Sequence, residues 1–293
     1  PPVVLRGPEE LTVNAATFAP DGGRLLVVFE DGSARIWPID SPVGPVVLKP
    51  LSIFASGSEG TYALFSPDGS TVLTMPYDSI GSHGPGMERP SARLWDARTG
   101  QLRREFAHAQ LADAAFSPDG TRVATVGGSS LIIWDGTSGR KLFELADHER
   151  EAVHVEFSRD GKWLLTAARD DIVRIRNAVD GTPVTLMRVP GKSFLRAASL
   201  SPDTRWELTL SDNDAARLWH WRGTPGNYAA ELHHGFDTYR VARFSADSKT
   251  LLTLAGDYSA RLWDVTTGRN LHELPHEDRI NQAAFSADGR WVV

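Results

Sequence analysis

The stretch FSADSKTLLTLAGDYSARLW, residues 244–263, is the unit that the rest of the chain repeats. It reads as the apolar end of a strand, a tight turn, a second strand, another turn and a third strand that closes on Trp-Asp. The register recurs with spacings of 47, 51, 41, 43, 44 and 41 residues. The landmark positions are Phe18, Phe65, Phe116, Phe157, Leu200, Phe244 and Phe285. A period of about 40–45 residues indicates an array of similar supersecondary units.

The turns between the expected strands have a physical signature. We name the four strands of each unit a to d, from the centre of the array outwards. Most units carry a variant of Ser-Pro-Asp-Gly between strands a and b. In it, proline presets φ, aspartate bonds its local backbone and glycine accepts a positive φ. Pairs such as Thr99-Gly100 turn strand c into strand d. Period-2 alternation supports strands throughout, so the pattern predicts an all-β chain.

A tryptophan closes strand c at Trp37, Trp95, Trp134, Trp219 and Trp263, and Arg176 takes its place in the fourth unit. These motifs resemble the WD-repeat family of β-propellers over essentially the whole chain, and in particular its near-uniform bacterial-type arrays. The resemblance implies a seven-bladed β-propeller of four-stranded antiparallel blades in a single domain, residues 1–293. In this family a strand from the N-terminus commonly completes the last blade, and Val3–Leu5 is placed to do so. We expect that last blade to be incomplete in this chain, which stops early in its second strand.

The second unit contains the main departure from the repeat. Phe65 to Trp95 spans 30 residues, and the surplus is the Gly- and Pro-rich segment Pro76–Pro90. We interpret this segment as a long b–c loop, because it is too rich in glycine and proline to form a strand. Loops of this size are often functional or disordered.

Composition excludes several classes of function. A formal charge of −6 argues against a general nucleic-acid binder, whose footprint is usually basic. The chain has no cysteine, so neither a disulfide framework nor a thiolate zinc site is possible. No apolar run approaches the ~18 residues of a membrane span. We therefore expect no nucleic-acid or membrane partner, and a cytoplasmic location.

One set of residues could be mistaken for a catalytic triad. The family holds a hydrogen-bonded set in each blade, and the resemblance assigns it in the sixth unit to His234, Thr253, Asp257 and Trp263. Partial copies recur in the fourth unit (His148, Thr166, Asp170) and in the third (His108, Thr125, Trp134), where Ser129 stands in place of the aspartate. Repetition is typical of structural parts, so we predict a structural network and no catalytic residue. The histidines show no metal-binding spacing, and we expect neither a metal nor a cofactor. Trp163, Trp206 and Trp291, each six residues past a landmark, are interpreted as packing between blades.

Partner contacts in this family come mostly from the d–a and b–c loops. Carried over position by position, the resemblance implies partner-binding residues at Glu59, Tyr77, Arg169, Phe194, Arg196, Asp212, Arg240, Arg279 and Asn281. The four arginines belong to units 4 to 7, whereas Glu30 and Glu59 belong to units 1 and 2. Because arginine pairs with carboxylate or phosphate through a planar fork, this distribution predicts a protein or peptide partner with an acidic or phosphorylated segment.

The favoured function is a non-enzymatic interaction scaffold or sensor module, one part of a larger multidomain protein. Two alternatives stay open at this point. One is a propeller enzyme with its active site in the central channel. The other is a structural ring that forms oligomers.

Overall fold

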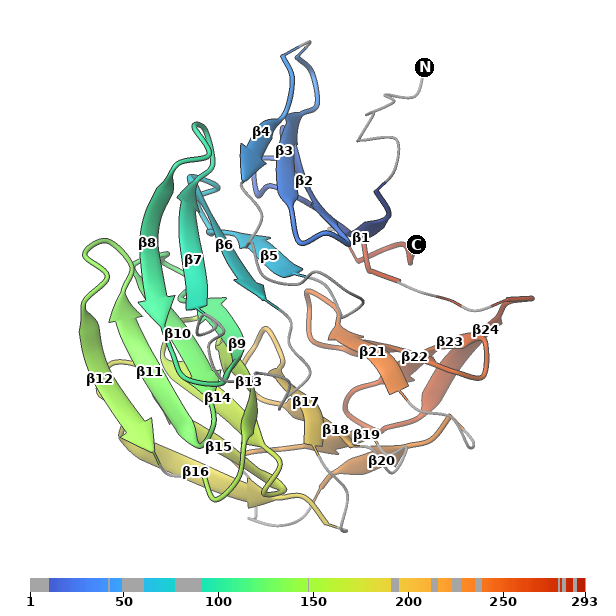
Figure 1. Cartoon of the computed structure of the whole chain (residues 1–293). Helices are drawn as coiled ribbons and strands as arrows, with labels where there is room; N and C mark the ends of the chain where they lie inside the picture. Colours follow the sequence, from blue (N-terminus) through green and yellow to red (C-terminus); the bar gives the residue numbers. More distant parts are fainter. Residues whose placement is uncertain are drawn as a thin grey trace. The chain divides into compact units, whose positions relative to one another are not determined.

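A computed structural model describes residues 11–41, 43–48, 61–76, 91–146, 148–190, 195–211, 216–222, 228–234, 239–278, 280, 283–286 and 289–292. The chain divides into two compact units, residues 1–145 and 146–293. Within the described ranges the secondary structure consists of strands, arranged as four-stranded antiparallel sheets with the strands in chain order (Figure 1). The predicted strand Val3–Leu5 and all of the predicted loop after Pro76 up to Pro90 lie outside these ranges.

The first compact unit contains three sheets. Sheet 1 consists of β1 (Val13–Phe18), β2 (Arg24–Phe29), β3 (Ala34–Pro38) and β4 (Val46–Leu48). Sheet 2 consists of β5 (Thr61–Phe65), β6 (Thr71–Pro76), β7 (Ser91–Asp96) and β8 (Leu102–Ala107). Sheet 3 consists of β9 (Leu111–Phe116), β10 (Arg122–Gly127), β11 (Ser130–Asp135) and β12 (Lys141–Ala146).

The second compact unit contains three more sheets. Sheet 4 consists of β13 (Ala152–Phe157), β14 (Trp163–Ala168), β15 (Ile172–Asn177) and β16 (Pro183–Arg188). Sheet 5 consists of β17 (Leu195–Leu200), β18 (Glu207–Ser211), β19 (Ala216–Trp219) and β20 (Ala230–Leu232). Sheet 6 consists of β21 (Tyr239–Phe244), β22 (Thr250–Ala255), β23 (Ser259–Asp264) and β24 (Asn270–Pro275).

The seventh repeat contributes a short hairpin to the described residues. Its landmark Phe285 forms an isolated bridge with Val292, and both side chains pack against an apolar cluster that contains Leu252 and Leu254 of sheet 6. The structure thus shows six complete four-stranded sheets and the start of a seventh repeat, and a complete seventh blade stays a prediction. Trp291 is 71% exposed, and its packing between blades stays a prediction, because sheet 1 belongs to the other compact unit.

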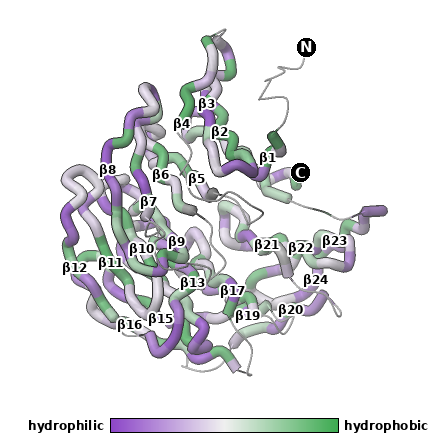
Figure 2. The backbone as a smooth tube through the Cα atoms, viewed as in Figure 1, coloured by the Kyte–Doolittle hydropathy of each residue, from purple (hydrophilic) through white to green (hydrophobic). Residues whose placement is uncertain are grey.

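The core lies between successive sheets of each unit. One apolar cluster joins sheets 2 and 3, and others join sheets 4 and 5 and sheets 5 and 6. The middle strands are covered on both faces, as in β14, where five of six residues are buried. The outer strands β8, β12, β16 and β24 are mostly exposed, and the middle of β8 is hydrophilic (Figure 2). Burial of both faces explains why the middle strands read as nearly continuous apolar runs.

The a–b turns repeat the same contacts. In sheet 2 the Ser66 hydroxyl donates to Asp68 (2.6 Å) and accepts the backbone N–H of Thr71 (3.0 Å). Gly69 completes this turn with φ of 67°, where a residue without Cβ has no steric penalty. Thr204 and Ser248 occupy the equivalent positions in sheets 5 and 6, with φ of 58° and 62°.

Candidate interaction surface and its supporting networks

The predicted contact residues that the structure describes lie in or beside the loops at one end of the sheets. In sheet 4, Arg169 follows β14, its backbone N–H donates to Glu151 (2.9 Å), and its Nε lies 3.5 Å from the Glu151 carboxylate. Both side chains are about two-fifths exposed, at 41% and 40%. Arg169 therefore already has an acidic neighbour, which reduces the positive potential that it offers a ligand.

Arg196 is the second predicted cation that the structure describes at this end of the second unit. It lies in β17 of sheet 5 and is exposed. Arg240 lies in β21 of sheet 6, where the structure describes its backbone only. The remaining predicted contact residues lie outside the described ranges: Glu59, Tyr77, Phe194, Asp212, Arg279 and Asn281. The predicted separation of the arginines of units 4 to 7 from the glutamates of units 1 and 2 therefore stays a prediction.

The predicted hydrogen-bonded set of His234, Thr253, Asp257 and Trp263 belongs to sheet 6 and the loops at this end of it. Trp263 Nε1 donates to the Thr253 hydroxyl (2.7 Å), which lies 2.6 Å from His234 Nε2. His234 Nδ1 faces both carboxylate oxygens of Asp257 at 3.3 Å. A carboxylate accepts hydrogen bonds only, so Nδ1 carries the imidazole proton and Nε2 accepts from the threonine. The structure thus brings all four residues into one chain of hydrogen bonds.

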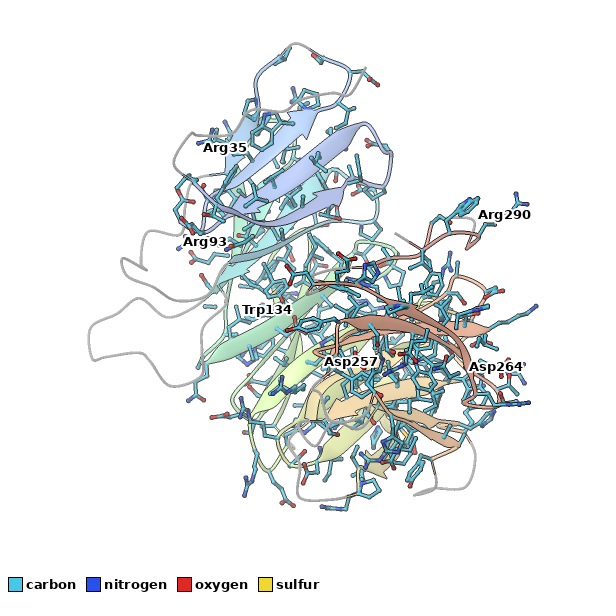
Figure 3. The ribbon with its side chains drawn as sticks, turned by 90° about the vertical axis from the view of Figure 1, so that its right-hand side faces the viewer. Arg35, Arg93, Trp134, Asp257, Asp264 and Arg290 are labelled. Carbon is cyan, nitrogen blue, oxygen red and sulfur yellow. The ribbon has the colours of Figure 1, made fainter. Side chains whose placement is uncertain are left out.

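Asp257 makes further contacts that join the network to strand c. Its carboxylate accepts hydrogen bonds from the backbone N–H (3.1 Å) and the hydroxyl (2.8 Å) of Ser259, and Arg261 Nη1 lies 2.8 Å away. Figure 3 labels Asp257 among the strands of the second unit. Burial favours a higher pKa for this carboxyl, but the Ser259 hydrogen bonds and His234 outweigh it, and the pKa of Asp257 is lowered. Burial, with the Arg261 charge, lowers the pKa of His234, so the imidazole is neutral at pH 7.

Sheet 4 contains a variant of this network without the tryptophan. His148 Nε2 lies 2.9 Å from the Thr166 hydroxyl, and its Nδ1 lies 3.2 Å from Asp170. Arg174 Nη1 approaches both Asp170 (3.1 Å) and His148 Nδ1 (2.6 Å). All four side chains are buried. The buried aspartate is thus balanced by an arginine, as Asp257 is by Arg261.

Sheet 3 contains a neutral variant. His108 Nδ1 lies 2.8 Å from Thr125, which also accepts a hydrogen bond from Trp134 Nε1 at 2.8 Å. His108 Nε2 lies 2.8 Å from the Ser130 hydroxyl. The sequence register suggests Ser129 as the substitute for the aspartate, and the structure corrects this to Ser130. A hydroxyl can replace the carboxylate here because both accept an imidazole N–H.

These networks are poorly suited to catalysis. Thr253 is 0% exposed and its hydroxyl is already engaged by both Trp263 and His234. A nucleophile needs access to a substrate carbonyl or phosphorus, which a fully buried hydroxyl lacks. Within the described ranges, no group of three His, Asp or Glu side chains is placed to hold a metal ion.

Sequence reasoning missed a second repeated feature, an arginine two residues before the closing tryptophan. Its guanidinium pairs with a glutamate of strand d in three sheets, with N–O distances of 3.1–3.2 Å. The pairs are Arg93–Glu105, Arg217–Glu231 and Arg261–Glu273. The arginine could have been found from the recurring Ala-Arg-Leu-Trp sequence. Its glutamate partner lies directly opposite the arginine in the strand register.

Comparison with known proteins agrees with this architecture. The profile of the WD40 family, described as "WD domain, G-beta repeat", matches residues 1–38, 100–135 and 139–177. Protein HIR1 of Phaeosphaeria nodorum is 29% identical over 175 residues, which cover 57% of this chain and 16% of the relative. Protein HIR1 of Yarrowia lipolytica is 26% identical over 237 residues, covering 67% and 22%. The WD repeat-containing protein 26 homolog of Arabidopsis thaliana is 23% identical over 211 residues, covering 71% and 33%.

The repeat pattern, the antiparallel four-stranded sheets and these matches together make the chain similar to WD-repeat proteins. Its fold class is that of the WD40 β-propellers, as the sequence predicted. The chain spans 16% to 33% of the length of the three relatives. These relatives are eukaryotic, which counts against the expected bacterial-type array. Within the part of the chain that the structure describes, no helix has the length and apolar composition needed to cross a bilayer.

Proposed function

We propose that this chain is a non-enzymatic interaction scaffold that binds a protein or peptide through the d–a and b–c loops. The carrying observation is that the repeated histidines and aspartates, the groups best suited to chemistry, are engaged in hydrogen-bonded networks in which the histidines are buried. What the same end of the sheets offers to solvent instead is side chains such as Arg196 in β17 and Arg169 after β14. Relatives with WD repeats support an interaction role in general terms.

The partner segment is proposed to be acidic or phosphorylated. Arg196 is exposed in β17, and Arg240 lies at the second position of β21, the equivalent position in the next sheet. A guanidinium binds carboxylate or phosphate through two parallel hydrogen bonds, so two of them on adjacent sheets favour an anionic ligand. Phe194, outside the described ranges, would supply the apolar anchor of such a contact.

The proposal places the chain within a longer polypeptide in the cytoplasm. A longer polypeptide is supported by the relatives, of whose length this chain spans only 16% to 33%. The absence of cysteine is compatible with a cytoplasmic location. Fractionation of cells that express the tagged full-length protein tests the location directly.

The experiment begins with a cross-linked pull-down on the full chain, followed by mass spectrometry of the captured partner. Affinity is then measured for Arg196→Glu with Arg240→Glu, and we expect a loss of at least tenfold, about 1.4 kcal/mol. The matched control is Arg205→Glu with Arg243→Glu, which makes the same charge change on sheets 5 and 6 at exposed positions near the a–b turns. Equal losses in the two double variants would show that total charge, and not this loop surface, determines binding.

A further inference from the structure

In sheets 1, 4 and 5 the residue six positions after the landmark, at or just before the start of strand b, lies in the seam between its own sheet and the next one. In sheet 1 this residue is Arg24, whose guanidinium lies 5.4 Å from the ring centroid of Phe65, the landmark of sheet 2. In sheet 5 it is Trp206, which packs into the apolar cluster with Phe244, the landmark of sheet 6. The seam is thus filled by a large flat side chain that approaches the next landmark.

The seam between sheets 4 and 5 is filled by two indoles and a guanidinium. Trp163 of sheet 4 meets Trp221 of sheet 5 edge to face, with ring centroids 5.6 Å apart. The Arg222 guanidinium lies over both rings, 5.3 Å and 4.7 Å from their centroids. Trp221 Nε1 donates to the backbone carbonyl of Thr204 in the a–b turn (3.0 Å).

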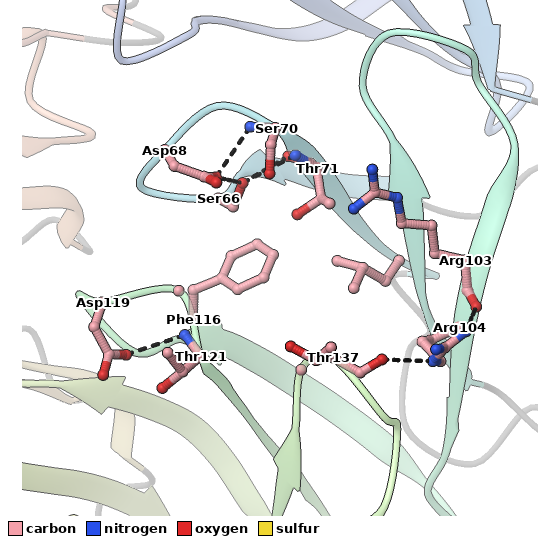
Figure 4. A pocket seen from close by; sticks show the side chains of 13 residues that line it. Ser66, Asp68, Ser70, Thr71, Arg103, Arg104, Phe116, Asp119, Thr121 and Thr137 are labelled. Atoms are coloured by element: carbon pink, nitrogen blue, oxygen red, sulfur yellow. Dashed lines mark hydrogen bonds between the residues drawn. The ribbon is translucent and has the colours of Figure 1, made fainter.

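Between sheets 2 and 3 the same three positions carry small residues. Thr71 replaces the tryptophan of strand b, Gly136 replaces Trp221, and Thr137 replaces Arg222. All three line a cavity of about 330 Å³ between these sheets (Figure 4). This volume lies near the lower end of the ~300–1,000 Å³ range of ligand pockets.

The walls of this cavity match an aromatic side chain. Phe116, the landmark of sheet 3, presents its ring to the open space, and Arg103 extends from β8 on the side of Thr71 (Figure 4). Gly120 lines the cavity at the position that corresponds to Thr204, whose carbonyl accepts the indole N–H in the other seam. A Cβ at Gly136 would come within 3.1–3.3 Å of the carbonyl oxygens of Thr121 and Gly120, so glycine keeps this side open.

The charged groups around the cavity already have partners. Arg103 pairs with Asp96 (2.5 Å), and Arg104 Nε donates to the Thr137 carbonyl (2.9 Å). The carboxylates of Asp68 and Asp119 accept hydrogen bonds from the serine hydroxyls of their own turns. A neutral flat ligand therefore suits the cavity better than a charged one, because it needs no counter-ion there.

We propose that the cleft between sheets 2 and 3 is a socket for the tryptophan side chain of a partner peptide, stacked on Phe116. It lies at the a–b and c–d turns, the opposite end of the sheets from the loops of the proposed function, and so constitutes a second contact surface. An inserted indole gains apolar burial on Phe116 and Leu94 and a cation–π contact with Arg103.

The test uses the full chain and the peptide Ac-Gly-Ser-Trp-Ser-Gly-amide with 5-fluorotryptophan, observed by fluorine NMR. We expect binding at millimolar peptide, displacement by the unlabelled peptide, and weaker displacement by analogues with leucine or arginine in place of tryptophan. Thr71→Trp fills the socket from within and should lower the affinity at least tenfold. Thr250→Trp is the matched control, because it makes the same substitution at the same repeat position of sheet 6.

Thr71→Trp should retain the wild-type melting temperature or exceed it, since it occupies existing space. If Thr71→Trp does not fold, Phe116→Leu serves instead. Leucine keeps the side chain apolar but removes the ring on which the indole stacks, so peptide binding should weaken at least threefold. Absence of peptide binding at millimolar concentration, equal binding by Thr71→Trp and wild type, or preference for the arginine peptide would each overturn the proposal. The Arg196→Glu, Arg240→Glu variant should bind this peptide normally, so the two proposals can fail separately.

Discussion

Glu207 of β18 pairs with Trp219 across the strand register, and its side chain is fully buried with neither carboxyl oxygen in a hydrogen bond. The equivalent residue is apolar in the other five sheets: Leu25, Val72, Val123, Leu164 and Leu251. Burial, with the nearby Glu156 carboxylate, raises the pKa of Glu207 well above its ordinary value of 4.5. Because a buried charge without a partner is costly, this acid is protonated in the folded chain.

The protonated state of Glu207 predicts a specific pH dependence of stability. Above pH 4.5 the unfolded chain loses this proton while the folded chain keeps it, so the free energy of unfolding falls as pH rises, until the folded pKa is reached. For one proton the maximal slope is about 1.4 kcal/mol per pH unit. Glu207→Leu removes the effect, so the stability difference between this variant and wild type should grow with pH.

Urea unfolding of both proteins at several pH values between about 5 and 8 measures this difference. Glu156→Gln serves as the control. It removes the carboxylate that helps to raise the pKa of Glu207 and retains a carbonyl acceptor for the Leu200 N–H. The pH dependence should therefore end at a lower pH than in wild type, without disappearing as it does in Glu207→Leu. A pH-independent difference between Glu207→Leu and wild type would contradict a protonated Glu207.

Thr204 offers a simpler stability prediction. It is a β-branched residue with φ of 58° in the a–b turn of sheet 5, where sheets 1 to 4 have glycine. The left-handed conformation costs non-glycine residues about 1–2 kcal/mol. Thr204→Gly keeps the carbonyl that accepts Trp221 Nε1, so we expect a gain of roughly 1 kcal/mol in the free energy of unfolding, measured by urea titration.

The reverse substitution checks the mechanism. Gly161 has the equivalent position in sheet 4, with φ of 70°. Gly161→Thr should lose a similar amount of stability. If both variants shift stability in the same direction, side-chain contacts rather than backbone strain determine the effect.

The local rules of the repeat were readable from sequence because each has its own chemical signature. Ser-Pro-Asp-Gly predicts the a–b turn, and the structure places Ser66 and Asp68 in the contacts that this turn requires. The residues of the sheet 6 network were likewise assignable, since the same types recur at the same offsets. Strand order followed from the short turns.

Features that depend on how neighbouring sheets pack were not predictable in the same way. Glu207 occupies an apolar position in the repeat, but only its burial among sheets 4 and 5 shows that it lacks a partner. The cavity beside Thr71 depends on the simultaneous absence of large residues at positions 71 and 136, which come from different repeats. Such coincidences across a seam have no local periodicity, so period-based reasoning cannot detect them.

The strand-c arginines predict a graded coupling energy. Arg217 and Glu231 have side chains 7% and 24% exposed, whereas Arg261 and Glu273 are 14% and 51% exposed. Water screens the more exposed pair more strongly. Double-mutant cycles with alanine should therefore give about 1.5 kcal/mol for Arg217–Glu231 and less than 1 kcal/mol for Arg261–Glu273. Equal coupling energies would show that solvent exposure does not control these pairs.

The last prediction concerns Asp257, which supports His234, Ser259 and Arg261 at once. Asp257→Ala leaves the His234 imidazole N–H buried without its acceptor and Arg261 with only Glu273 as a partner. We expect a loss of about 1–3 kcal/mol in the free energy of unfolding, because unsatisfied buried donors cost this much. Urea titration measures it, with Glu277→Ala, an exposed acid, as the control, expected within about 0.5 kcal/mol of wild type. His234 is neutral and Asp257 ionised at pH 7, so the loss should shrink as pH falls toward the lowered pKa of Asp257. A melting temperature of Asp257→Ala equal to that of wild type would show that the network contributes nothing to the fold.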